Sequence, residues 1–263
     1  MHSDVFDRYH HGHSLLHRLD ARIKVVVTIA FILSNVLLPD GAWLAFLLAW
    51  IFLLTANLFA RLGFGFTFRR SFVALPFALV AVTAIFSIPG HPLAEWHFGM
   101  TTLIPTDAGV LRFVSILVRS WLSVQMAILL VAVTEFPKIL HALEHLRVPS
   151  IITTIIAFLY RYLFVLTDEV MRLLRARQAR SAAAPGFKPG RGVRWQARIA
   201  GNMAGQLFLR SYERSDRIYN AMLSRGYQGQ LMTLHPPRIA RLDWLAGLGA
   251  FIFLVSIQIL GRL

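Results

Sequence analysis

Residues 171–198 read MRLLRARQARSAAAPGFKPGRGVRWQAR, and they belong to the one long stretch that is rich in charge, Glu135 to Arg241. From Met171 to Arg241 this stretch carries fourteen cations against only two anions, Glu213 and Asp216. A segment of this kind cannot lie in the hydrocarbon core of a bilayer, whereas the residues on both sides of it are mostly apolar. We therefore expect a polar helical segment that is anchored by membrane-spanning helices on both sides of it in the sequence.

The composition indicates the same class of protein. The chain has 263 residues, of which 56% are hydrophobic and 15% charged, and its mean hydropathy is +0.59. A soluble domain of this size needs more surface charge, so we predict an all-α integral membrane protein with several spans. The absence of cysteine excludes disulfides, thiolate metal sites and a cysteine nucleophile.

The net charge of +14 indicates anionic partners. The aromatic residues lie mainly in apolar runs and do not alternate with the arginines, as a base-stacking surface would require. We therefore expect no nucleic acid as a partner. Membrane lipid of the inner leaflet and an acidic protein fit better.

Apolar runs predict about five spans, because a bilayer core needs about 20 residues. The runs are 23–38, 42–58, 72–88, 109–134 and 242–260. Pro39-Asp40-Gly41 predicts a tight turn, Pro76 predicts a kink, and 59–71 and 89–108 are predicted loops. In the fourth run we expect Arg112 to reach the membrane surface and Arg119 to bond to neighbouring helices.

The cations lie next to alternate ends of these spans. They precede the first span and follow the second and fourth, while residues 39–41 and 89–108 contain none. The positive-inside rule then predicts a cytoplasmic N-terminus. We expect the chain in the inner membrane of a bacterial cell. A further apolar run, Ile151–Leu166, would place the arginine-rich segment outside if it crossed the bilayer. We interpret it as part of an amphipathic helix, although a count of six spans remains possible.

This topology divides the chain into four parts: a polar lead-in (1–22), a four-helix membrane region (23–134), a cytoplasmic coupling domain (135–241) and a C-terminal span (242–263). The coupling domain should hold a short amphipathic helix at about 137–147 and two long ones at about 150–183 and 193–223. The breaker-rich residues 185–192 lie between the long helices. Two apolar stripes have helical spacing. They are Ile155, Leu159, Leu163, Leu166, Val170 and Leu173, and then Ile199, Met203, Leu207, Ser211, Ser215, Ile218 and Met222.

Each long helix ends on an arginine between small residues. Ala179-Arg180-Ser181 closes the first helix, and Ser224-Arg225-Gly226 closes the second. The macrodipole favours a cation at a helix C-terminus, and Gly226 suits a left-handed cap. Small neighbours would also let each arginine enter a groove and form bidentate contacts with carboxylates or carbonyls.

With these motifs the chain resembles the transmembrane T components of energy-coupling factor transporters, the EcfT group, and most closely its CbiQ branch. The resemblance also rests on the lead-in Leu19-Asp20-Ala21-Arg22-Ile23-Lys24 and on Tyr160-Arg161. The family usually has proline where this sequence has Ala21. The resemblance implies that both X-Arg-X motifs seat in grooves of two ABC-type ATPases, and we place Arg172, Arg175 and Arg217 on the supporting surface.

The resemblance also implies the other partners. For CbiQ these are CbiO-like ATPases, which bind ATP and Mg²⁺, and a CbiM-like substrate-binding membrane subunit with a CbiN-like small subunit, which deliver Co²⁺. This chain would then be a non-catalytic subunit with no cofactor, metal or catalytic residue of its own. It contains no G-x-x-x-x-G-K-[ST] motif for phosphate binding.

Two alternatives remain open. His141-Ala142-Leu143-Glu144-His145 matches H-x-x-E-H, an inverted zinc-protease motif in which two histidines bind Zn²⁺ and the glutamate activates water. That motif needs a third ligand, and the simpler interpretation is the polar face of a short helix. The second alternative is the same coupling role for nickel or a vitamin, because another subunit would choose the substrate.

Overall fold

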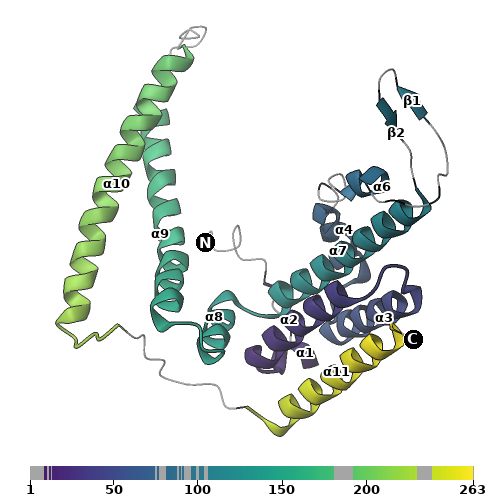
Figure 1. Cartoon of the computed structure of the whole chain (residues 1–263). Helices are drawn as coiled ribbons and strands as arrows, with labels where there is room; N and C mark the ends of the chain where they lie inside the picture. The colour runs from purple at the N-terminus through teal and green to yellow at the C-terminus, as the bar shows by residue number, and fades with distance from the viewer. Residues whose placement is uncertain are drawn as a thin grey trace. The chain divides into compact units, whose positions relative to one another are not determined.

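The computed structural model describes residues 9–10, 12, 14–74, 76, 81–87, 89, 91, 96–98, 101–103, 106–180, 192–229 and 239–262. The chain forms two compact units, residues 1–146 with 236–263 and residues 147–235. Apart from an antiparallel hairpin of Trp96–Phe98 (β1) and Thr101–Leu103 (β2), the regular structure in these ranges is helical (Figure 1). The predicted all-α membrane class is confirmed.

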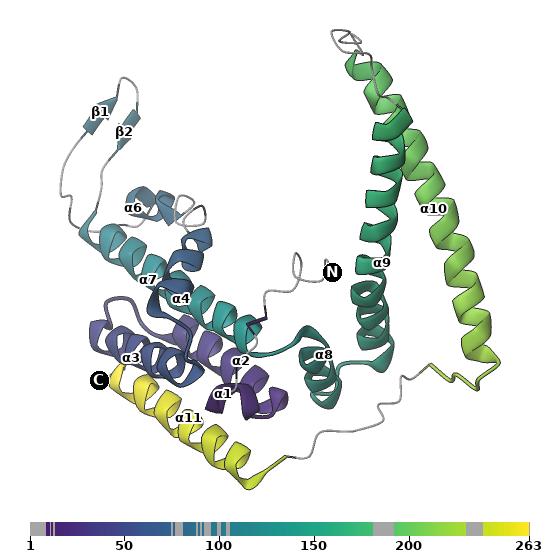
Figure 2. The ribbon, with the colours of Figure 1, turned by 180° about the vertical axis from the view of Figure 1, so that it is seen from behind.

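Helices α2, α3, α7 and α11 enclose the hydrophobic core of the first unit, where Phe31, Leu53, Leu129 and Ile257 are fully buried. Figures 1 and 2 show these four helices side by side. The helices of this unit are α1 (Leu15–Arg18), α2 (Ala21–Leu37), α3 (Trp43–Ala60), α4 (Phe64–Ser71), a 3₁₀ helix (Phe72–Ala74), α6 (Thr83–Ser87), α7 (Asp107–Val133), α8 (Phe136–His145) and α11 (Arg241–Leu260).

Hydrogen bonds fix the directions of the core helices. The Asp20 N–H donates to Asp243 Oδ1 at 3.0 Å, and the side chains of Ser34 and Gln258 bond at 3.2 Å, so α2 and α11 are parallel. Lys24 Nζ donates to the Val133 carbonyl at 3.3 Å, and Asn35 Nδ2 donates to the Arg119 carbonyl at 3.0 Å. Helix α7 is therefore antiparallel to α2.

The chain between α3 and α7 differs from the prediction. Residues 59–71 were expected to be a loop, but 64–71 form α4, whose last turn carries Arg69 and Arg70 at the end that a helix dipole favours. The predicted span 72–88 begins as a 3₁₀ helix and is not one continuous helix in its described parts, 72–74, 76 and 81–87.

This segment still passes α7 in the opposite direction. The rings of Phe68 and Phe72 both lie 5.4 Å from Trp121, in the middle of α7. Further along the chain, the Thr106 N–H, at the start of α7, donates to the Ile85 carbonyl at 3.3 Å. The chain therefore returns across the layer once between α3 and α7.

By length and composition, four helices of the described residues are able to cross a membrane: α3, α7, α9 (Ser150–Arg180) and α11. Helix α2 has 17 residues and is slightly shorter than these, although it lies in the same layer. The sequence analysis assigned the apolar half of α9 to the membrane surface. Its length and composition would also allow a span.

The second unit is a pair of long helices, α9 and α10 (Val193–Leu223), the latter with the predicted bounds (Figure 2). Helix α10 has no buried residue, and in α9 only Thr153 and Thr154 are buried. The residues of the predicted apolar stripe of α10 are half-buried, with one exception. Ser215 is exposed, and its neighbour Arg214 is half-buried instead. In α9 the stripe is half-buried from Leu163 onward, whereas Ile155 and Leu159 are exposed.

The contacts group α8 with the first unit, where it packs against α2, although the sequence analysis placed it in the coupling domain that begins at residue 135. The amphipathic character predicted for α8 is present, since Leu140 and Ala142 are buried while Glu144 and His145 are exposed.

An arginine inside α7 holds the turn between α2 and α3, as expected. Arg119 Nη2 donates to the Leu38 carbonyl at 2.6 Å and to Asp40 Oδ1 at 2.8 Å, so it satisfies a carbonyl that α2 leaves free at its C-terminus. Gly41, whose φ is +82°, follows in the turn and donates its N–H to Ser115 Oγ. Arg112 lies 3.8 Å from the other oxygen of Asp40.

We predict that Arg119→Met destabilises the membrane unit by about 1.5–3 kcal/mol, because charge-assisted hydrogen bonds in a partly buried site are lost. Arg112→Met is the matched control: its side chain is 56% exposed, against 19% for Arg119, and it should cost at most about 1 kcal/mol. Unfolding of the detergent-solubilised variants in sodium dodecyl sulfate measures both. Equal losses in the two variants would contradict this assignment.

Candidate functional site

The C-terminal end of α10 presents Arg225 on a defined cap. The Tyr227 N–H donates to the Met222 carbonyl and the Gly226 N–H to the Leu223 carbonyl, both at 3.0 Å. This is the Schellman arrangement, in which Gly226 has a φ of +81°, as a left-handed cap residue requires. Ser224 Oγ donates to the Asn220 carbonyl, and the Arg225 side chain is exposed. The predicted role of Gly226 as a cap is confirmed.

The described part of α9 ends on Arg180, which is also exposed. Ala179 precedes it in the last turn, while Ser181 lies outside the described residues. Arg180 lines a groove together with Trp195, which lies in the first turn of α10. Thirty residues separate Trp195 from Arg225, which corresponds to about 45 Å along α10. The two predicted site arginines therefore lie at opposite ends of the helix pair.

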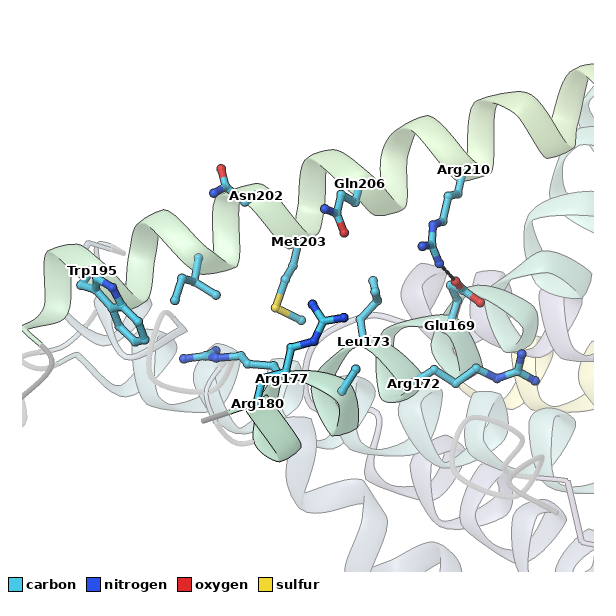
Figure 3. Close-up of a pocket in the computed structure, with 12 residues that line it drawn as sticks. Glu169, Arg172, Leu173, Arg177, Arg180, Trp195, Asn202, Met203, Gln206 and Arg210 are labelled. Carbon is cyan, nitrogen blue, oxygen red and sulfur yellow. Dashed lines mark hydrogen bonds and ion pairs between the residues drawn. The ribbon is translucent and has the colours of Figure 1, made fainter. Parts of the chain in front are cut away.

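The groove between α9 and α10 has a volume of about 680 Å³ and is strongly basic (Figure 3). Arg172, Arg177 and Arg180 line it from α9, and Arg210 lines it from α10. Glu169 is the one acidic residue in the lining. Leu173, Ile199 and Met203 make the apolar part of its walls. The groove therefore combines excess positive charge with partly apolar walls.

Glu169 and Arg210 form an ion pair that joins the two helices, drawn as a dashed line in Figure 3. Arg210 Nη1 donates to Glu169 Oε1, and Glu169 is the less exposed of the two side chains. The sequence analysis did not pair Glu169 with Arg210. The sequence does show opposite charges on two long helices. Which charges pair, however, depends on how the two helices are aligned with each other, and the spacing of residues within one helix does not give this alignment.

The other predicted arginines lie on α9 and α10. Arg172, Arg175 and Arg217 are exposed, and Arg175 Nε donates to the Met171 carbonyl within its own helix at 3.2 Å. Arg172 also lines the groove, whereas Arg175 and Arg217 do not. Of the three, only Arg172 is brought together with Arg180.

The H-x-x-E-H residues lie on α8. His141 Nδ1 is 3.8 Å from Glu144 Oε2, and the rings of His141 and His145 are 5.1 Å apart. Desolvation, together with the positive charge of Arg22 and His141, lowers the pKa of the His145 ring and favours its neutral form. Within the described residues, no group of three histidine, aspartate or glutamate side chains has the geometry to hold a metal ion. The third ligand of a zinc-protease site is therefore not found in these ranges.

Comparison with known proteins gives one family. The model of the CbiQ family, described as cobalt transport protein, matches residues 12–235. The energy-coupling factor transporter transmembrane protein EcfT of Lactococcus lactis subsp. cremoris is 28% identical over 236 residues, which cover 87% of this chain and 86% of the relative.

Two further relatives match over a similar length. The EcfT protein of Lacticaseibacillus paracasei is 26% identical over 271 residues and 98% of both chains. An uncharacterised protein of Methanocaldococcus jannaschii is 27% identical over 242 residues, or 89% of this chain and 78% of the relative. Because the family model covers most of the sequence, including both long helices, the chain belongs to the EcfT/CbiQ family of transporter membrane proteins.

Proposed function

We propose that this chain is the transmembrane coupling subunit of an energy-coupling factor importer for cobalt ions, which transmits the motion of two ATPases to a substrate-binding membrane subunit. The observation that carries the proposal is the second unit. It is a pair of long helices with almost no buried residue, and exposed arginines lie at the two ends. A unit of this kind needs a partner to cover it.

The separation of the two arginines favours two partner sites. Arg180 lies toward the Trp195 end of the helix pair and Arg225 lies at the other end, so the two arginines are farther apart than one groove for a single side chain extends. Each would insert its planar guanidinium among carboxylates or carbonyls of one ATPase. In this mechanism closure of the nucleotide-bound ATPase pair draws the two arginines together, and the crossing helices tilt.

The directions of the membrane helices support a location of both long helices on one side of the bilayer. Helix α7 ends beside the start of α2, and α11 begins beside the same end. The chain between Val133 and Arg241 thus returns to the face that it leaves, and crosses the bilayer an even number of times. Helix α10 is not among the helices able to span, and the segments 181–191 and 230–238 are too short to cross as helices. A crossing by α9 would therefore have no return.

The remaining partners follow from the family. CbiO-like ATPases would bind ATP and Mg²⁺, and a CbiM-like subunit with a CbiN-like small subunit would deliver the cobalt ion as substrate. The family description, cobalt transport protein, favours cobalt over nickel or a vitamin. Adjacent genes for an ATPase and a small metal-binding membrane protein would distinguish metal import from vitamin import.

We predict that Arg180→Glu with Arg225→Glu abolishes co-purification with the ATPases and metal uptake. Reversing a charge in a buried ion pair costs about 2–5 kcal/mol per site, or roughly thirtyfold or more in affinity. Arg194→Glu with Arg198→Glu is the matched control, because both arginines are exposed on α10 and belong to neither X-Arg-X motif. Co-purification and ATP-dependent uptake of cobalt are the measurements.

The double variant should still insert into the membrane, which its abundance in the membrane fraction checks. Normal assembly of the Arg180/Arg225 variant, or an equal loss in the Arg194/Arg198 control, would remove these arginines from the ATPase contact.

The topology can be tested with single cysteines, since the chain has none of its own. Ser215 on α10 and Ala108 in the first turn of α7 are both exposed. With a membrane-impermeant thiol reagent on intact cells, we expect Ala108→Cys to be labelled and Ser215→Cys to be labelled only after permeabilisation. Labelling of Ser215→Cys in intact cells would contradict a cytoplasmic coupling unit.

The Glu169–Arg210 pair should transmit force between the helices. We predict that Glu169→Arg places two cations opposite each other and uncouples ATP hydrolysis from uptake. Adding Arg210→Glu reverses the pair and should restore most of the coupling. The ratio of cobalt imported to ATP hydrolysed in vesicles is the measurement. If the double exchange is no better than Glu169→Arg alone, the pair has no part in coupling.

A further inference from the structure

An apolar groove of about 350 Å³ runs along the surface of the membrane unit between α2 and α11. The two helices approach closely beside it, since a Cβ on Gly247 would lie only 3.2 Å from Ile23 Cγ2. Val26 and Phe251 form exposed rims, and the buried side chain of Leu254 closes the floor. The groove therefore opens toward the surroundings of the membrane helices.

The length of the groove matches one leaflet of a bilayer. Its lining extends on α2 from Arg22 to Ala30 and on α11 from Trp244 to Leu254, or about 12 Å and 15 Å along the helices. Half of a hydrocarbon core of about 30 Å is about 15 Å. A partner transmembrane helix is about 10 Å wide and spans both leaflets, so it is too large for this volume. A single acyl chain has the right shape.

One end of the groove is polar. Arg22 and Trp244 line it there, both in the first turn of their helices, and an indole at this level is typical of a membrane interface. Arg18 and Arg241 are exposed at the same end.

Asp20 and Asp243, two carboxylates at this end, are already bonded within the protein. Asp20 accepts the Arg22 N–H and lies 3.9 Å from the Arg22 guanidinium, while Asp243 accepts the N–H groups of Asp20 and Ala240. Arg18, Arg22 and Arg241 thus outnumber the hydrogen-bonded carboxylates of Asp20 and Asp243.

We propose that this groove binds one acyl chain of an anionic phospholipid, with the phosphate of the head group at Arg22 and the chain between α2 and α11. The site joins the start of the first membrane helix to the start of the last. A bound lipid would bridge these helices at the face from which the polar segment leaves. The proposal rests on the membrane unit alone and is independent of ATPase coupling.

The test compares phosphatidylglycerol with phosphatidylcholine of the same acyl chains. The purified, detergent-solubilised chain is incubated with an equal mixture, and retained lipid is counted by mass spectrometry. We expect a preference for phosphatidylglycerol that Arg22→Gln lowers about fivefold, the effect of one cation at a membrane surface. Arg69→Gln, an exposed arginine outside the groove, should leave the preference unchanged.

A second pair of variants tests the acyl site without changing charge. Val26→Trp fills the groove and should prevent retention of either lipid. Val36→Trp, on the same helix and also exposed but outside the groove, should retain lipid as the parent chain does. The proposal is overturned if Val26→Trp retains as much lipid as Val36→Trp, or if Arg22→Gln and Arg69→Gln lower the preference equally.

Discussion

The cation of Arg119 lies within a membrane helix, and its Nη2 group donates both of its hydrogen bonds at one place, the turn between α2 and α3. By donating to the Leu38 carbonyl and to Asp40, it fixes the level at which α7 passes α2. Two further hydrogen bonds fix the other end of these helices. Lys24 Nζ donates to the Val133 carbonyl, and the Asp20 N–H donates to the Asp243 carboxylate. Since unsatisfied polar groups are costly in hydrocarbon, these contacts select one register of three helices. The return of the chain to its starting face follows from that register.

The two units are stabilised in different ways. The membrane unit has a core of large side chains such as Phe31, Leu53 and Ile257, whose packing excludes alternative arrangements. The helix pair has no such core, and its arginines repel one another along both helices. In the proposed function, an anionic partner would complete the surface of this helix pair. The Glu169–Arg210 pair is then one of few contacts that define the spacing of the helices.

Much of this architecture could be predicted from the sequence, because apolar runs and breakers determine helix bounds locally. The bounds of α10 and the Gly226 cap are examples. The loop expected at 59–71 was wrong in part, because Arg69 and Arg70 suggested a loop although cations also suit the last turn of a helix, here α4. The exposure of Ile155 and Leu159, and the pairing of Glu169 with Arg210, depend on tertiary register, which periodicity does not contain.

The geometry of the helix pair also limits how it could transmit motion. Because Arg180 and Arg225 lie at opposite ends, forces applied there act on two long arms, and a contact between the arms serves as a pivot. Glu169 and Arg210 lie well inside both helices, eleven residues from Arg180 and fifteen from Arg225. At 1.5 Å per residue these arms are about 16 and 22 Å long. In the proposed coupling role, a small displacement of either arginine would become a rotation about this pair, and an intact pair would make one arm respond to the other.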